Sequence, residues 1–241
     1  MLSIEVELAP FLKRRIVWFS SKPRIWNCFA TIYKQSAYCK PVPGYKRDAF
    51  YTKIIDLTQD EKLLQEGFKK NTSYEVGRAV RDGVVTSIES CPNTFRRFYN
   101  LFAQTKNLNQ ISASKLRSYG PNLIITKAVY QDLNVVMHSY VIDPDLKRVR
   151  LLHTASLYRN EDNAEMRSVI GRANRLLHFM DMRHFKSLGY IEYDLGGYAL
   201  NTRNKILDGI NKFKDGFGGV LREESDYSPY LFVLISRLLN R

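Results

Sequence analysis

The sequence predicts a mixed α/β fold, in which helices join the strands of a single sheet. Helix-like and strand-like segments alternate through the last third of the chain, as they do where a crossover helix returns the chain to the sheet. Three strand-like segments follow one another before that point, which a purely doubly wound sheet does not show. With 44% apolar residues, a chain of 241 residues can bury a sizeable core.

Strands are predicted where alternating or β-branched residues run between turn signals. The sequence DPDLK at 143–147 is the predicted turn between the second and third of the three consecutive strands. The predicted strands are 50–57, 84–89, 122–130, 133–143, 148–158, 190–195 and 219–224.

Helices are predicted where apolar residues recur every three or four positions, as Phe95, Phe98 and Phe102 do within 91–107. Thr58 is the predicted N-cap of the first helix, which has acidic residues in its first turn and lysines in its last. The predicted helices are 58–71, 73–83, 91–107, 112–120, 165–189 and 204–216.

The expected organisation is an N-terminal extension at 1–50, with a few short strands, followed by one domain at 51–241. The apolar end of the chain, 229–241, is too short to span a bilayer and is expected to be a packed terminal helix. Seating of this helix in a membrane interface is the alternative. The start of the chain does not resemble a signal peptide, so we expect a cytoplasmic protein, with peripheral contact to the inner membrane face under that alternative.

The chain is strongly basic, with 37 Lys and Arg against 24 Asp and Glu and a formal charge of +13. This favours anionic partners such as phosphates, an acidic carrier protein, RNA or a membrane surface; the alternative is a basic protein whose charge serves no partner. The three cysteines and four histidines form no metal-binding pattern, so no metal is expected. Hydrolase, P-loop and dinucleotide motifs are missing from the sequence.

Asp194 stands at the end of a predicted strand, just before Gly196 and Gly197. Ligands of open α/β sheets bind at such strand ends, where a carboxylate can orient an amine or accept its proton. Glu192 has the same parity along the strand and is the weaker alternative base. The structural alternative for Asp194 is capping of the following loop.

Lys214 belongs to the sequence KFKDGFGG, and its ammonium can stabilise a developing oxyanion or bind an acceptor phosphate. The glycines at 216, 218 and 219 suggest a bend that approaches a ligand closely. Phe213 is assigned to the substrate site, with core packing as its alternative. Tyr193 and His178 are assigned to the same site, while His184 is expected to be exposed.

The N-terminus of the long helix is the predicted donor site, since unpaired backbone N–H groups there attract phosphate. Its candidate residues are Arg167, Ser168, Gly171 and Arg172. The alternative is an ordinary helix start with exposed arginines.

Four segments, 50–84, 151–159, 170–197 and 209–219, together resemble the Fem-type branch of the GNAT acyltransferase superfamily. The resemblance covers roughly 50–225 and is most specific in Tyr-Asp-Leu-Gly-Gly followed by Lys-Phe-Lys-x-x-Phe-Gly-Gly. It implies a GNAT-like fold and a lysine, here Lys214, near the transferred group. It also places His153 on the strand that lines the acyl pocket, as a base or as a structural residue. The donor motif departs from the family pattern, since the sequence RSVIGRA has one residue too many before its first glycine.

The function implied is N-acyl transfer from an acyl-coenzyme A thioester to an amine of an amino sugar or similar bacterial cell-surface polysaccharide precursor. The amine would attack directly, with Asp194 or His153 as base and Lys214 stabilising charge. The alternatives are a transferase of cell-wall or lipid precursors that uses acyl-carrier protein or aminoacyl-tRNA as donor, and a non-catalytic binding module. No DNA partner is expected.

Overall fold

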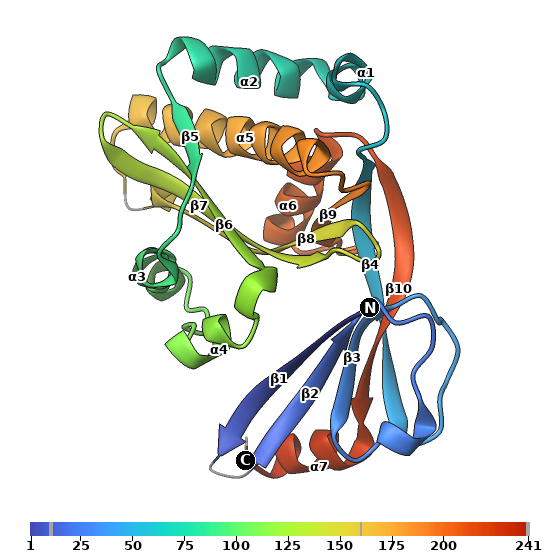
Figure 1. Cartoon of the computed structure of the whole chain (residues 1–241). Helices are drawn as coiled ribbons and strands as arrows, with labels where there is room; N and C mark the ends of the chain where they lie inside the picture. The colour runs from blue at the N-terminus through green and yellow to red at the C-terminus, as the bar shows by residue number, and fades with distance from the viewer. Residues whose placement is uncertain (10–11, 160, 240–241) are drawn as a thin grey trace.

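The computed structural model describes residues 1–9, 12–159 and 161–239, and it confirms the mixed α/β sheet. The strand order is β1-β2-β3-β10-β4-β9-β8-β7-β6-β5 (Figure 1). The strands are β1 (Leu2–Ala9), β2 (Leu12–Trp18), β3 (Thr31–Ser36), β4 (Tyr45–Asp56), β5 (Val85–Ile88), β6 (Leu123–Tyr130), β7 (Leu133–Asp143), β8 (Arg148–Ser156), β9 (Glu192–Gly197) and β10 (Val220–Pro229).

Helices cover both faces of the sheet around its centre. In Figure 1, α2 and α5 lie side by side over one face of the β6–β8 region, whereas α3 and α4 lie on the other. The helices are α1 (Glu61–Glu66), α2 (Lys70–Arg81), α3 (Pro92–Thr105), α4 (Ala113–Arg117), α5 (Ala164–Ser187), α6 (Lys205–Asp215) and α7 (Tyr230–Leu239).

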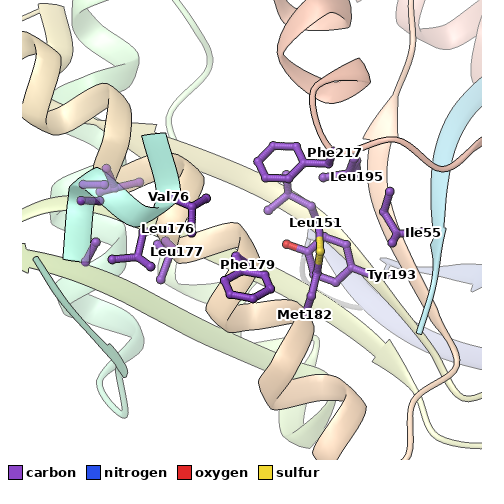
Figure 2. Close-up of a cluster of buried hydrophobic side chains, with 14 of the residues drawn as sticks. Ile55, Val76, Leu151, Leu176, Leu177, Phe179, Met182, Tyr193, Leu195 and Phe217 are labelled. Carbon is purple, nitrogen blue, oxygen red and sulfur yellow. The ribbon is translucent and has the colours of Figure 1, made fainter. Parts of the chain in front are cut away.

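The largest apolar cluster lies between α2, α5 and the sheet, and it is aromatic near β9. The ring of Phe68 meets Phe179 and Phe217 edge to face, with centroids 5.6 and 5.3 Å apart. Figure 2 shows Phe217 beside Leu151 and Tyr193 at one end of this cluster. Burying each such side chain contributes about 1.5–3 kcal/mol, so this cluster fixes α5 against the strands that form the site.

The N-terminal strands belong to the same sheet as the rest of the chain. β2 pairs with β3 in parallel, and β3 pairs with β10, which continues well beyond the predicted strand 219–224. β4 runs through residue 50, so the expected boundary between 50 and 51 falls inside a strand. The division into an extension and a domain stays a prediction.

Two helices were predicted here, 58–71 and 73–83, and two form, but the predicted position of the break between them is wrong. The break at Gly67–Lys69 lets Phe68 turn into the core between α5 and the segment after α6. Thr58 does not cap α1; its backbone N–H donates to Asp56 Oδ1 at 2.8 Å, and Asp60 precedes the helix.

The apolar C-terminal segment forms the predicted helix, α7, but part of its apolar surface is exposed and not packed as expected. Leu231, Leu234 and Ile235 are exposed on it. Within the described ranges no helix combines the length and apolar character that crossing a bilayer requires.

Candidate active site

The site lies where β8 and β9 separate. These strands run parallel but pair only at Arg148–Arg150 against Glu192–Asp194. Beyond these pairs, residues 151–154 and 195–197 line a cavity of about 540 Å³. A bulge in β8 accompanies the separation, since Ser139 pairs with His153 and Tyr140 with Leu151, which leaves Leu152 without a partner in β7. The strands thus diverge and open the sheet for a ligand.

One side of the cavity is lined by α6. The N-cap of this helix, Asn204, accepts hydrogen bonds from the N–H groups of Ile206 and Leu207. At the floor of the cavity Gly196 has φ +76, and a Cβ there would lie 3.2 Å from the carbonyl oxygen of Leu151. Glycine therefore permits the close approach of β9 to β8 at the point of divergence. The lining residues are Phe102, Lys106, Arg150, Leu151, Leu152, His153, Thr154, Ser156, Tyr158, Asn174, His178, Leu195, Gly196, Gly197, Ile206, Gly209, Ile210, Phe213 and Lys214.

Lys214, predicted from its motif, lines this cavity and is only 9% exposed. Its ammonium donates a short hydrogen bond to the carbonyl oxygen of Gly197 and forms no ion pair with a described carboxylate. Burial lowers the pKa of Lys214 to about 8, and the positive charge of Arg150 adds to the effect while Asp194 opposes it. A cation is thus held without a counter-ion at the mouth of the strand divergence.

Arg150 is the second cation of the cavity. Its guanidinium donates to the carbonyl oxygen of Leu151 at 3.0 Å and lies 5.0 Å from the ring centroid of Trp18. It forms no ion pair with a described carboxylate, its Nε has no hydrogen-bond partner among the described residues, and burial lowers its pKa. None of the residues found to line the cavity is acidic.

A second cavity, of about 610 Å³, adjoins the first and shares Ser156, Tyr158, Asn174, Gly209 and Phe213 with it. It is also lined by Gly171, Arg175 and Lys212. The guanidinium of Arg175 donates to the carbonyl oxygen of Gly171 at 3.0 Å and lies 5.1 Å from the ring centroid of Phe213. Together the two cavities form one basic site on either side of Phe213.

Asp194, predicted as a base, is fully buried and lies outside the cavity lining. Arg148 donates to its Oδ2 at 2.5 Å, Gln35 donates at 2.8 Å, and Thr52 makes a short hydrogen bond to Oδ1. Although burial opposes ionisation, Arg148 and the other donors hold the pKa of Asp194 below its usual value. The residues that follow it in β9, Leu195 and Gly196, line the cavity, and the ion pair of its carboxylate with Arg148 holds β9 in place. The role of Asp194 as a base stays a prediction that this geometry does not favour.

Arg148 holds a second carboxylate in the same network, since its Nη1 lies 2.6 Å from Glu224 Oε1. Glu192, the weaker alternative base, forms a two-pronged ion pair with Arg222 at 2.7 and 2.8 Å. These carboxylates tie β9 to β8 and β10, and so hold the base of the divergence together.

His153 and His178 both line the cavity, from β8 and α5. His153 Nδ1 lies 2.9 Å from the hydroxyl of Ser139, and burial, with Lys115 and Arg150 nearby, lowers its pKa to about 3. His178 Nδ1 lies 2.7 Å from the hydroxyl of Tyr193, and burial lowers its pKa well below 6.5.

The other assigned substrate residues differ in position. Phe213 lines both cavities, whereas Tyr193 is fully buried behind His178 and lines neither. His184 is half-buried against Phe185, not exposed as predicted.

The predicted donor residues at the start of α5 do not share one site. Arg172 points to α2, where its Nε lies 2.7 Å from Asp82 Oδ2, and Ser168 donates to the carbonyl oxygen of Ala164. Arg167 lines a separate depression with Glu161 and Asp162. Of the four predicted donor residues, only Gly171 is among those that line the second cavity. The first turn of α5 carries Glu165 and is capped by Asn163, so it presents acidic groups.

The glycine bend after α6 approaches the chain itself. A Cβ on Gly218 (φ +73) would collide with the carbonyl oxygen of Gly67, and one on Gly219 (φ +76) with that of Ile54. A Cβ on Gly216 would collide with Thr72 Oγ1. These glycines thus seat α6 against α2 and β4, and the expectation that they form a bend against a ligand is wrong.

Sequence reasoning missed Arg150, Arg175, Asn174 and the buried group around His138 and Asp181. A signal existed for Arg150, because it lies between Val149 and Leu151 near the start of a predicted strand, where a charge needs a partner or a function. Asn174 and His178 are four residues apart and therefore share one face of α5. Nothing in the sequence pairs His138 with Asp181.

No protein-family model and no curated protein matches the chain. The fold is nevertheless found among solved structures. FemX matches with a TM-score of 0.64 at 11% identity, over 97% of this chain and 85% of FemX. L-PGS from Bacillus licheniformis matches with a TM-score of 0.57 at 14% identity, over 95% of this chain and 83% of that one.

The C-terminal domain (DUF2156) of a candidate lysylphosphatidylglycerol synthetase from Agrobacterium fabrum also matches, with a TM-score of 0.54 at 11% identity. The match covers 82% of this chain and 66% of that one, so this chain spans just under two thirds of its length. These likenesses establish the architecture. The chain therefore has the Fem-type, GNAT-like fold that the sequence resemblance implied.

Proposed function

We propose that this protein is an acyltransferase that binds an acyl donor where β8 and β9 diverge and transfers the acyl group to an amine. The leading donor is an acyl-coenzyme A thioester, and the leading acceptor is an amino sugar or a similar precursor of cell-surface polysaccharide. The amine attacks the carbonyl carbon directly, and Lys214 stabilises the oxyanion that forms.

The observation that carries the proposal is a pair of cations, the buried Lys214 and the half-buried Arg150, in a cavity whose lining residues include no acid. Burying a charge without a partner is costly, and such groups concentrate at functional sites. An anion, either the oxyanion of acyl transfer or a phosphate of a substrate, supplies the missing counter-charge. A non-catalytic module that binds neutral sugars would not need the two positive charges of Lys214 and Arg150 in its binding site.

The donor fits the two adjoining cavities. The acyl carbonyl would lie in the first, beside Lys214, while the donor's phosphates would reach the second, where Arg175 and the backbone at Gly171 lie. Of the donor residues predicted from sequence, this arrangement retains Gly171. It assigns no phosphate contact to Arg172, whose charge is already paired with Asp82.

A second candidate keeps the chemistry and changes the carrier. FemX and the two synthetase-related structures share this fold, and the name lysylphosphatidylglycerol synthetase implies lysyl transfer to a lipid. An aminoacyl-tRNA donor, or an acyl-carrier protein, also suits a chain of charge +13. A protein working on a lipid precursor would contact a membrane peripherally.

The test is a transfer assay with product detection by mass spectrometry. Acetyl-, succinyl- and palmitoyl-coenzyme A, acyl-carrier protein and lysyl-tRNA are each combined with glucosamine, a uridine-diphosphate-linked amino sugar and phosphatidylglycerol vesicles. We expect an amide product from one coenzyme A thioester and an amino sugar. Lysyl-tRNA as the only active donor would replace the coenzyme A assignment.

Two variants make the assay specific to the cavity. Lys214→Met should lower kcat at least 100-fold, in line with removal of one oxyanion-stabilising group. Lys205→Met, an exposed lysine at the start of the same helix, should leave it unchanged. Equal activity in both variants, or no transfer with any donor, would refute the proposed function.

A further inference from the structure

A chain of short hydrogen bonds runs from a buried carboxylate to the cavity. Asp181 Oδ2 lies 2.6 Å from the hydroxyl of Tyr140, which lies 2.6 Å from the hydroxyl of Tyr193, which in turn lies 2.7 Å from His178 Nδ1. All four side chains are at most 4% exposed. The four residues come from three elements, β7, β9 and α5, so the fold alone assembles the chain.

The direction of the protons in this chain follows from counting them. The hydroxyls of Tyr140 and Thr126 donate to Asp181 Oδ2 at 2.6 and 3.0 Å, and His138 Nδ1 lies 3.0 Å from the same oxygen. Such a site fits an ionised carboxylate, which only accepts. The single proton of the Tyr140 hydroxyl is therefore donated to Asp181, so Tyr193 must donate its own proton to Tyr140. His178 Nδ1 must then carry a hydrogen and donate it to the oxygen of Tyr193.

This arrangement fixes the tautomer of His178. A neutral imidazole carries one N–H, so a proton on Nδ1 leaves a lone pair on Nε2. Burial, together with the neighbouring His138, Lys214 and Arg175, lowers the pKa of His178 well below 6.5, which favours the neutral ring. Nε2 makes no hydrogen bond to any described residue, and the side chain lines the cavity. An acceptor nitrogen is therefore presented to the site.

We propose that His178 is the general base of the transfer, and that Tyr193, Tyr140 and Asp181 are positioning residues that keep its Nε2 unprotonated and stabilise the imidazolium. The proposal rests on the proposed function and reassigns His178 from substrate binding to catalysis. It also replaces the bases suggested by the sequence, which are Asp194, His153 and the weaker alternative Glu192.

The step balances without a further reactant. The amine nitrogen forms a bond to the carbonyl carbon, whose π electrons move to the oxygen beside Lys214. The adduct nitrogen, now positively charged, passes a proton to His178 Nε2. The oxyanion collapses, the bond from carbon to the leaving sulfur breaks, and the imidazolium returns its proton to the thiolate. A weak base suffices, since the proton comes from an acidic, ammonium-like adduct.

His153 is less suited to this role. Its Nδ1 hydrogen-bonds to the hydroxyl of Ser139, and among the described residues no carboxylate is hydrogen-bonded to that hydroxyl to stabilise an imidazolium. Cationic neighbours oppose protonation of both histidines, Lys115 and Arg150 beside His153 and Lys214 and Arg175 beside His178, so they do not separate the two. By contrast, the chain behind His178 ends on Asp181. Charge stabilisation through this chain is what distinguishes the two histidines.

The tautomer can be measured without any substrate. The chain has four histidines, so long-range ¹H–¹⁵N spectra of protein labelled at histidine are readily assigned from single substitutions. We expect His178 to remain neutral, with its proton on Nδ1, between pH 5.5 and 8. In Tyr193→Phe the acceptor of that proton is removed, so the proton should shift toward Nε2. A wild-type His178 that carries its proton on Nε2 would overturn the proposal.

Activity then tests the role itself, with the donor and acceptor that give product in the transfer assay above. We expect His178→Asn to lower kcat about 100-fold or more with little change in the donor KM, Tyr193→Phe to lower it less, and the control His184→Gln to leave it unchanged. His178→Asn with wild-type kcat, or loss of activity in His153→Asn alone, would overturn the assignment. Absence of transfer by the wild-type protein would refute the proposed function, and the tautomer measurement would still decide whether Nε2 is free.

Discussion

Replacing Lys214 with methionine should stabilise the protein near neutral pH. The change removes a buried ammonium while keeping a long apolar side chain. Burial lowers the pKa of this lysine from 10.5 to about 8, so the charged form is disfavoured in the folded state. Such a shift corresponds to about 3 kcal/mol at pH 7, less the hydrogen bond to Gly197 that the variant loses.

The pH dependence of stability isolates the cost of burying the Lys214 ammonium. Between pH 8 and 10.5 the unfolded chain binds more protons at Lys214 than the folded chain, so wild-type stability gains from this group as pH rises. Methionine does not titrate. The advantage of Lys214→Met should therefore shrink by about 2 kcal/mol between pH 7 and pH 10.

Urea unfolding at pH 7, 8.5 and 10 measures this difference, with Lys205→Met as the control for an exposed lysine of the same helix. The control should show no comparable change with pH. A stability difference between Lys214→Met and wild type that stays constant from pH 7 to 10 would refute the reasoning, because the ammonium would then be as well solvated as in the unfolded chain.

Three further predictions concern the frame of the site. Arg148→Ala leaves two buried carboxylates without their cation and should lower the free energy of unfolding in urea by about 3–5 kcal/mol, whereas a loss below about 1 kcal/mol would contradict the buried network. Gly218→Ala should destabilise the protein strongly, because the new Cβ would collide with a backbone oxygen. Gly209 is exposed in α6 with open space around it, so Gly209→Ala should raise the free energy of unfolding by about 0.5–1 kcal/mol. Equal effects of the two substitutions would contradict the packing described. The ring of His153, with a pKa of about 3, should show no NMR titration between pH 5 and 8, and an inflection near 6.5 would contradict its burial. Because the ring is buried as a neutral group, the stability of the wild type should fall more steeply than that of His153→Asn as the pH drops from 6.5 toward 3.

Local signals in the sequence were sufficient for several elements. β7 spans 133–143 as predicted, because its alternation ends at the DPDLK turn. α5 agrees within two residues at each end, since Asn163 caps it and Gly189, with φ +83, follows it. Lys214 was found through its motif and lies in the cavity. For these features the determining residues are close in sequence.

Features set by distant residues could not be predicted. Two successive helices were predicted, but the position of the break between α1 and α2 depends on Phe68 packing against α5 and the segment after α6, which no local pattern reveals. In the sequence Asp194 resembles a free carboxylate at a strand end, but in the fold Arg148 and Gln35, from two other strands, donate hydrogen bonds to it. The chain from Asp181 to His178 likewise needs tyrosines from β7 and β9.

The central claim is that the divergence of β8 and β9 holds an acyl donor against the cations Arg150 and Lys214. The most direct measurement is the melting temperature with unreactive thioether analogues of acyl-coenzyme A, since a ligand of the folded state must raise it. Wild type, Arg150→Met and Lys205→Met are compared after each is shown to unfold cooperatively. We predict a rise in wild type and in Lys205→Met that is largely lost in Arg150→Met. A rise that survives in Arg150→Met, or none with any analogue, carrier protein or tRNA, would contradict the account.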